Sequence, residues 1–96
     1  MNIGNYVFNG PYDPSKGFKN NFGAVYAILD DYNNVIDVGE AGNINDRFPN
    51  HDRKDCWPKH AHGNTQLFIL LDSNIDKRLQ IESGIRNQYN PPCGER

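Results

Sequence analysis

The chain has 96 residues, of which 36% are hydrophobic and 23% charged, with a formal net charge of −2 and a pI of about 5.8. A chain of this length forms one domain with a single modest core. Proteins that bind nucleic acid are more often basic, because most of their affinity comes from neutralising phosphates. The mild acidity therefore argues against tight nonspecific DNA binding, although it leaves room for a local basic cleft.

Composition also bears on location. No apolar run approaches the roughly 18 residues of a membrane span, and the N-terminus lacks the charged-then-apolar layout of a signal peptide. We therefore expect a cytoplasmic protein without membrane contact. Two cysteines, Cys56 and Cys93, are too few for a disulfide framework, so we expect reduced thiols in that compartment.

Residues 1–22 are rich in asparagine, glycine, proline and aromatic side chains, and Pro11 and Pro14 interrupt regular structure. The aromatic content predicts an N-terminal extension packed on the domain, with a short strand at Asn5–Phe8. A second interpretation is that the extension shapes the edge of a substrate groove. The domain itself is predicted to span residues 23–96.

The next segment is predicted to be a β-hairpin. Ala24–Leu29 is apolar nearly throughout, which is typical of a central strand buried on both faces. A polar turn over Asp30–Asn34 separates it from a second strand, Val35–Val38. The ring of Tyr26 is expected at the core margin, where its hydroxyl needs a partner or a wet cleft.

A glycine-containing bend then leads to residues 43–48, which read as a helix that Pro49 kinks or ends. Arg47 and His51 are four residues apart and share one face if the helix continues. Residues 51–64 are polar and irregular. They predict a long loop, which in a small domain is usually functional or mobile.

A third strand is predicted at Gln66–Leu71, followed by a helix that starts at Ser73 with a capping-box-like pair to Asp76. Glu82 falls on or beside the apolar face, where a carboxylate is costly to bury unless it is paired or bound to a metal. Gly84 suggests close approach by another backbone. The apolar positions of this helix are Ile75, Leu79, Ile81, Ile85 and Tyr89.

These motifs and their spacing resemble the GIY-YIG endonucleases. The first tripeptide of that family matches Ala24-Val25-Tyr26, and the second falls on Asp37-Val38-Gly39. Arg47 and His51 follow Tyr26 at the spacing seen in the family, and the helix that carries Glu82 resembles a later family element. The resemblance implies a small α/β (α+β) domain with a central, mainly antiparallel three-stranded sheet flanked by helices.

The resemblance also implies an activity, the metal-dependent hydrolysis of phosphodiester bonds in DNA. Tyr26 would orient or deprotonate the attacking water, Arg47 would clamp the phosphate and His51 would assist proton transfer. Glu82 would hold one Mg²⁺ or Mn²⁺. Further substrate contacts are expected from Gly39, Lys54, Lys59, His60 and His62.

Two positions depart from the family pattern. Asp37 replaces the second tyrosine, and Gly94 stands where the family usually has asparagine. Asp37 could repel phosphate or add a second oxygen ligand for the metal, and the neighbouring Glu40 makes the cleft more acidic. The alternative function is therefore a catalytically impaired module that binds nucleic acid or a protein partner.

The sequence allows further interpretations of specificity and of the individual residues. Substrate choice would come from the extension, the loop, a homodimer or a partner protein, and a nuclease toxin delivered to competing cells would fit the small size. Glu82 could simply pair with Arg78 or Arg86, four residues away on either side. A zinc site is a further hypothesis, although its spacing is not that of a usual zinc finger. Its ligands would be Cys56, His60, His62 and Cys93.

Overall fold

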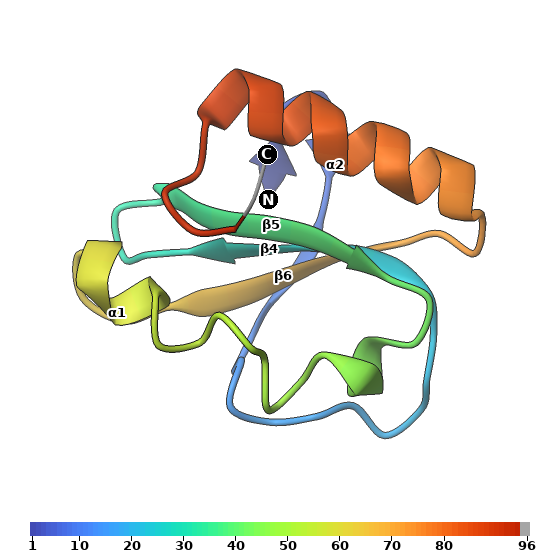
Figure 1. Ribbon diagram of the computed structural model, residues 1–96, viewed down its shortest axis with the longest axis horizontal. Coiled ribbons are helices and arrows are strands. Elements are labelled where there is room, and N and C mark those ends of the chain that lie inside the picture. The colour runs from blue at the N-terminus through green and yellow to red at the C-terminus, as the bar shows by residue number, and fades with distance from the viewer. Residues whose placement is uncertain (95–96) are drawn as a thin grey trace.

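The computed structural model describes residues 1–94, which form an α+β fold with a four-stranded antiparallel sheet, a two-stranded antiparallel sheet and two α-helices (Figure 1). The strands are β1 (Asn2–Ile3), β2 (Tyr6–Val7), β3 (Asn9–Tyr12), β4 (Ala24–Leu29), β5 (Val35–Ala41) and β6 (Gln66–Leu71). The helices are α1 (Trp57–His60) and α2 (Ile75–Tyr89), with a 3₁₀ turn, η1, at Ile44–Asp46. The larger sheet has the order β3-β6-β4-β5.

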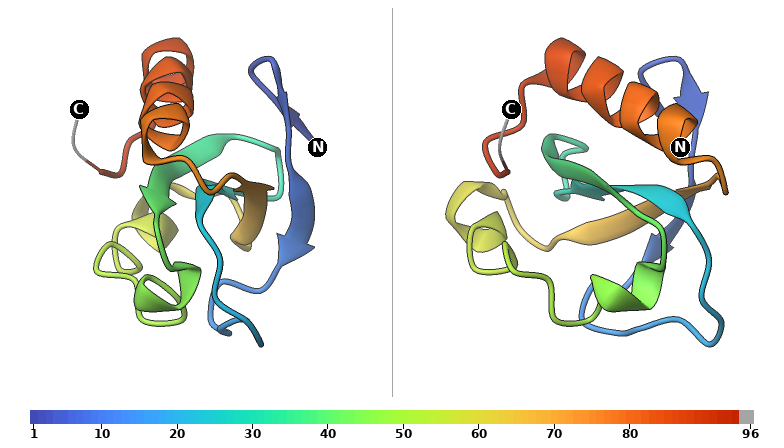
Figure 2. Two further views of the ribbon diagram at one scale, coloured as in Figure 1. Left: turned by 90° about the vertical axis from the view of Figure 1, so that its right-hand side faces the viewer. Right: turned by 45° about the vertical axis from the view of Figure 1, so that its right-hand side comes forward.

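The fourth strand comes from the N-terminal segment, which corrects the prediction of three strands. β3 pairs with β6, with Asn9 opposite Ile69, and β1 and β2 form a small hairpin beside α2 (Figure 2). The strand was not predicted, because Pro11 was expected to interrupt regular structure. Because β3 is an edge strand, a residue without an N–H group is tolerated there.

The predicted hairpin is confirmed. β4 pairs with β5 on one side and β6 on the other, and all six of its residues are buried, as expected for a central strand. Asp30 holds the turn, because its Oδ1 accepts the backbone N–H groups of Tyr32 at 3.0 Å and Asn34 at 2.9 Å. An aspartate that accepts from the backbone two residues on is a common turn former.

The sheet separates two hydrophobic layers (Figure 2). On one face Tyr26 and Ile28 pack with Phe48 and Trp57 from the segment between β5 and β6. On the other face β4 packs against the hairpin and α2, through Val25, Ala27, Leu29, Ile3, Phe8, Ile81 and Ile85.

Helix α2 differs from the prediction in its cap and its buried face. Its N-cap is Asn74, whose side chain accepts from Lys77 N at 3.0 Å, in place of Ser73 and Asp76. Three of the predicted apolar positions, Ile75, Leu79 and Tyr89, are exposed. The buried positions are Arg78, Ile81, Ile85 and Arg86.

Two arginines are buried on α2 because acidic residues of β5 face them, as described below. The expectation for Gly84 is wrong, since a Cβ built there meets no atom within 4 Å. Among residues 1–94, no helix combines the length and apolar character needed to cross a membrane.

The segment after β5 contains less helix than expected at residues 43–48 and more within the 51–64 loop. Only η1 forms in the first, and α1 interrupts the second. Cys56 precedes α1 and forms a disulfide with Cys93, so the expectation of two reduced thiols is wrong. Cys93 N also donates to Ile36 O of β5 at 3.0 Å. The C-terminal segment thus covers part of the edge strand, which would otherwise offer unpaired backbone groups.

Candidate functional site

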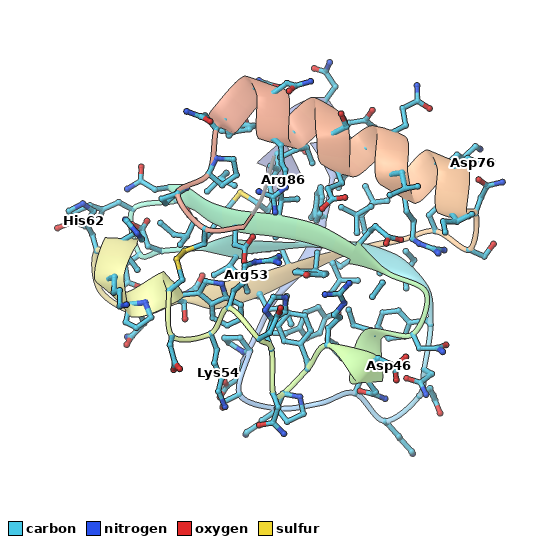
Figure 3. The ribbon with its side chains drawn as sticks, viewed as in Figure 1. Asp46, Arg53, Lys54, His62, Asp76 and Arg86 are labelled. Carbon is cyan, nitrogen blue, oxygen red and sulfur yellow. A yellow bond between two sulfur atoms is a disulfide. The ribbon has the colours of Figure 1, made fainter. Side chains whose placement is uncertain are left out.

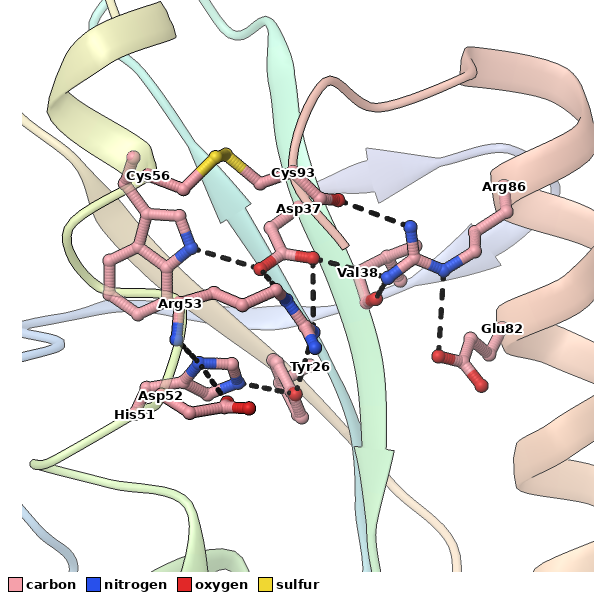
Figure 4. Close-up of polar contacts among 11 residues, drawn as sticks. Tyr26, Asp37, Val38, His51, Asp52, Arg53, Cys56, Glu82, Arg86 and Cys93 are labelled. Atoms are coloured by element: carbon pink, nitrogen blue, oxygen red, sulfur yellow. Dashed lines mark hydrogen bonds and ion pairs between the residues drawn. A yellow bond between two sulfur atoms is a disulfide. The ribbon is translucent and has the colours of Figure 1, made fainter. Parts of the chain in front are cut away.

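Tyr26 and His51 are both about 1% exposed and contact each other at the centre of the site (Figure 4). The Tyr26 hydroxyl oxygen lies 2.6 Å from His51 Nε2. Gly39 is the cross-strand neighbour of Tyr26, and a Cβ at Gly39 would overlap the Tyr26 hydroxyl. The pairing of β4 with β5 therefore explains why a glycine occurs at this distance from the tyrosine.

The hydrogen bonds of His51 define its tautomer. Arg53 N donates to Nδ1 at 3.0 Å, so Nδ1 is an acceptor. Burial, with a further contribution from the Arg53 charge, lowers the pKa of His51 to about 4. The ring is therefore neutral at pH 7, carries its proton on Nε2 and donates to Tyr26. Asp52 Oδ1 lies 3.2 Å from Nδ1, and because the ring is neutral this contact is no ion pair at pH 7.

Tyr26 is a neutral phenol at pH 7. Burial raises the pKa of Tyr26 to about 12, and the nearby charges of Arg53 and Arg47 oppose this effect without overcoming it. The phenol oxygen accepts from His51 Nε2 and, at 3.4 Å, from Arg53 Nη2. No residue in 1–94 accepts the hydroxyl hydrogen through a hydrogen bond, so this hydrogen is available to a water or a phosphate oxygen.

Asp37 lies on the edge strand β5, with its side chain completely buried. Arg53 Nε donates to its Oδ2 at 2.8 Å and Trp57 Nε1 donates to the same oxygen at 2.9 Å. Its Oδ1 accepts from Nη2 of Arg53 and Nη2 of Arg86, both at 3.2 Å. Figure 3 shows Arg86 on the α2 side of β5 and Arg53 on the loop side. Because Asp37 accepts hydrogen bonds from both arginines, it joins the two layers.

This arrangement limits the part that Asp37 could take in metal binding. Both of its oxygens accept N–H groups, three of which belong to arginines. A metal ion at Asp37 would have to displace these cations.

Gly94 lies against Asp37 and its partner Arg86. Gly94 has a φ of +92°, a conformation that favours glycine. A Cβ at this position would overlap Arg86 Nη2 and would lie 2.9 Å from Asp37 Oδ1. An aspartate at position 37 and a glycine at position 94 thus serve the same buried ion pair.

Glu82 is accessible from solvent, with 23% of its side chain exposed. Its Oε2 lies 3.6 Å from Arg86 Nε, and no residue in 1–94 donates a hydrogen bond to its Oε1. Burial, with the charge of Glu40 adding to it, raises the pKa of Glu82. Arg78, the other candidate partner, pairs with Glu40 at 2.9 Å instead. A partly exposed carboxylate oxygen fits a hard cation whose remaining ligands are water or phosphate oxygens.

Arg47 is half-buried, and its side chain forms no hydrogen bond or ion pair within residues 1–94, although its backbone N–H donates to Ile44 O at 3.0 Å. Its charge nevertheless lowers the pKa of both Tyr26 and His51, which places the guanidinium within electrostatic range of that pair. No continuous helix joins Arg47 to His51, so the two do not share a helical face.

The remaining predicted substrate contacts are dispersed. Gly39 is buried, Lys54 lines a groove of about 290 Å³, and Lys59, His60 and His62 are exposed on or after α1. The other residues of the groove are Pro14, Ser15, Pro49, Asn50, Trp57 and Thr65. Because two of these come from residues 1–22, the N-terminal segment forms part of a groove edge.

Arg53, Trp57 and Arg86 were not identified as site residues from the sequence, although Arg86 was a candidate partner of Glu82. The available signal was Asp37 itself. A carboxylate in the middle of an otherwise buried strand requires cations or N–H donors around it. No protein-family model, curated protein or solved structure matches the chain. The geometry of these side chains is therefore the basis for a functional proposal.

Proposed function

We propose that the chain is a metal-dependent endonuclease of the GIY-YIG type that hydrolyses phosphodiester bonds in DNA. The observation that supports it best is the Tyr26–His51 pair beside two arginines that retain donor capacity. Arg53 uses Nε and Nη2 for hydrogen bonds and leaves Nη1 without a partner in residues 1–94, and the guanidinium of Arg47 donates to no residue there. Cations beside a polarised hydroxyl suit a reaction in which negative charge grows on phosphate oxygens.

Each residue has a role in this proposal. The Tyr26 hydroxyl directs its free hydrogen to the attacking water or to a phosphate oxygen, and His51 holds the phenol through Nε2. If Tyr26 loses its proton during the reaction, the phenolate keeps two N–H donors, from His51 and Arg53. Arg47 and Arg53 stabilise the charge of the transition state. The substrate meets Arg53 before Tyr26, because the Arg53 side chain is 26% exposed.

Glu82 is the residue that would hold Mg²⁺ or Mn²⁺. A bound ion would polarise the phosphate and lower the pKa of a coordinated water. Glu82 is the one carboxylate assigned to the metal, and its Oε2 already lies 3.6 Å from Arg86 Nε, so we expect weak metal binding in the absence of substrate.

A second candidate function is a catalytically impaired module that binds nucleic acid or a protein. Two observations favour this function. Tyr26 is about 1% exposed, and Arg53 donates two hydrogen bonds to Asp37. The endonuclease proposal requires Arg53 to turn toward the phosphate and open access to Tyr26. In the binding module the Asp37 cluster is purely structural.

The disulfide argues against the cytoplasmic location expected from the sequence. Disulfides persist in oxidising compartments and are rare in the cytosol. The Cys56–Cys93 bond therefore favours a protein that passes through an oxidising compartment over one that stays in the cytoplasm. This fits the hypothesis of a nuclease delivered to other cells. A homodimer or a protein partner remains the proposed source of specificity.

The test is cleavage of plasmid, single-stranded and branched DNA by the purified chain with Mg²⁺, Mn²⁺ or EDTA. We expect cleavage that EDTA abolishes and that Glu82→Ala and Arg47→Ala both lose. Asp76→Ala, an exposed acidic residue in the first turn of α2, is the matched control and should cut normally. Binding without cleavage on every substrate would favour the impaired module.

A further inference from the structure

The disulfide and one histidine form a second cluster. None of its residues is among those assigned to phosphodiester chemistry. The Sγ atoms of Cys56 and Cys93 and a ring nitrogen of His60 all lie within 4.8 Å of one another. Two sulfurs and an imidazole are the ligand types that zinc prefers. In the oxidised chain the two sulfurs are bonded to each other, so only the reduced chain could bind a metal ion through both of them.

The backbone around the cluster brings the three ligands together by contacts other than the S–S bond. Cys56 is the N-cap of α1 and His60 is its last residue, so the two are separated by one helical turn on the same face. Cys93 is held to β5 by its N–H bond to Ile36 O at 3.0 Å. Its carbonyl oxygen also accepts from Arg86 Nη1 at 3.2 Å. None of these hydrogen bonds uses a cysteine sulfur.

We propose that the reduced chain binds one Zn²⁺ through Cys56 Sγ, Cys93 Sγ and a ring nitrogen of His60. A dithiol reductant transfers two electrons and two protons to the S–S bond, giving two thiols and leaving the reductant as its own disulfide. Zn²⁺ then replaces the two thiol protons, which are released to solvent, and the thiolates become ligands.

The distances suit this change. Zinc takes sulfur at about 2.3 Å and imidazole nitrogen at about 2.0–2.1 Å, so the ligand atoms of a tetrahedral site are spaced by roughly 3.3–3.8 Å. The sulfurs must move apart from bonding distance, while a ring nitrogen of His60 already lies within 4.8 Å of both. His60 is exposed at the end of α1 and can change rotamer without disturbing the core. The fourth position would hold water.

His62 is excluded from this site, although the sequence grouped it with the other three. Its ring stacks on Tyr32 with centroids 5.7 Å apart, and it does not belong to the cluster of ligand atoms. The two histidines therefore provide a matched pair for a test.

A zinc site in the reduced chain would have a structural consequence. The disulfide in oxidising surroundings, and zinc in reducing ones, would each tie the C-terminal segment to the start of α1. Gly94 follows Cys93 and packs on Arg86 and Asp37, so this tie supports the buried ion pair in both conditions. The inference does not depend on the proposed nuclease activity, and its test measures metal binding alone.

The experiment is a cobalt titration of the full chain, reduced with a phosphine so that no added thiol competes for the metal. We expect one Co²⁺ per chain, with thiolate-to-cobalt charge-transfer absorption and the visible bands of tetrahedral cobalt, displaced by Zn²⁺. The oxidised chain should show neither signal. His60→Gln should weaken binding by at least the roughly 10–100-fold that loss of a metal-supporting residue brings. His62→Gln should bind like the unmodified chain.

Circular dichroism of the reduced chain, with and without metal, separates binding from unfolding. Refolding driven by stoichiometric metal would support the site. The proposal is overturned if the reduced chain takes up no cobalt, whether folded or unfolded, or if His60→Gln and His62→Gln bind with equal affinity.

Discussion

Replacement of Asp37 by asparagine tests the buried cluster that joins the two layers of the fold. The substitution keeps the size of the side chain and removes its charge, leaving Arg86 buried and Arg53 half-buried without their common counter-ion. An asparagine also has one oxygen in place of two, so it cannot accept the four N–H bonds that Asp37 receives. We expect a large loss of stability with little change in shape.

The magnitude follows from the burial of the three partners. Removal of one member of a buried ion pair typically costs about 3–5 kcal/mol, because the other charge is left uncompensated. The Arg53 side chain is 26% exposed and can turn into water, whereas Arg86 is 9% exposed and cannot. We therefore expect the lower end, about 3 kcal/mol. For a domain of this size each 1 kcal/mol lowers Tm by about 4–8 °C, which gives a decrease of roughly 12–24 °C.

The assay is thermal and urea unfolding of the oxidised chain, followed by circular dichroism. Asp52→Asn is the matched control, since it makes the same chemical change beside Arg53 on a side chain that is 74% exposed. Its effect should be within about 0.5 kcal/mol of zero. If Asp37→Asn unfolds at the same temperature as Asp52→Asn, the cluster is not holding the layers together and the reasoning is refuted.

Three further predictions concern stability. Gly84→Ala should stabilise the chain by about 0.5–1 kcal/mol, because the new methyl group enters open space in α2, and an unchanged or lower Tm would contradict this. Gly94→Ala should destabilise by more than about 1 kcal/mol, because its φ is +92° and the methyl group would overlap Arg86; urea unfolding with an unchanged midpoint would count against it. The folded-state pKa of His51 is about 4, below its ordinary value of 6.5, so the unfolded chain binds more protons between these limits. Stability should therefore fall as pH is lowered from about 6.5 to 4, and His51→Gln should weaken that dependence in urea unfolding measured at several pH values.

The elements that sequence predicted best are those specified by local patterns. Ala24–Leu29 is continuously apolar and proved to be the central strand, and Asp30 forms the predicted turn through its own neighbours. The resemblance in spacing grouped Tyr26 with His51, and these two side chains are in contact. Strand pairing explains part of this contact, since Gly39 lies opposite Tyr26 and leaves room for its hydroxyl.

The features that sequence missed depend on contacts between distant segments. Arg86 was considered only as a partner of Glu82 within the same helix, and only the packing of α2 on β5 brings it to Asp37, 49 residues away. The Cys56–Cys93 bond was missed for a similar reason, since two cysteines 37 residues apart carry no local signal that they meet. β3 was hidden by Pro11, which suggests a break unless the strand is known to lie at an edge.

The most direct test of the proposed function is the DNA cleavage rate of Tyr26→Phe under single-turnover conditions with saturating Mg²⁺. The substitution removes one oxygen from a buried ring and keeps the aromatic packing with Phe48, whose centroid is 5.1 Å away. Tyr32→Phe is the control, because that ring is 75% exposed in the turn between β4 and β5. With both variants shown to be folded, we predict a rate loss of at least about 100-fold for Tyr26→Phe and a normal rate for Tyr32→Phe. Equal rates for the two variants, or no cleavage by the unmodified chain, would contradict the assignment of Tyr26 to phosphodiester chemistry.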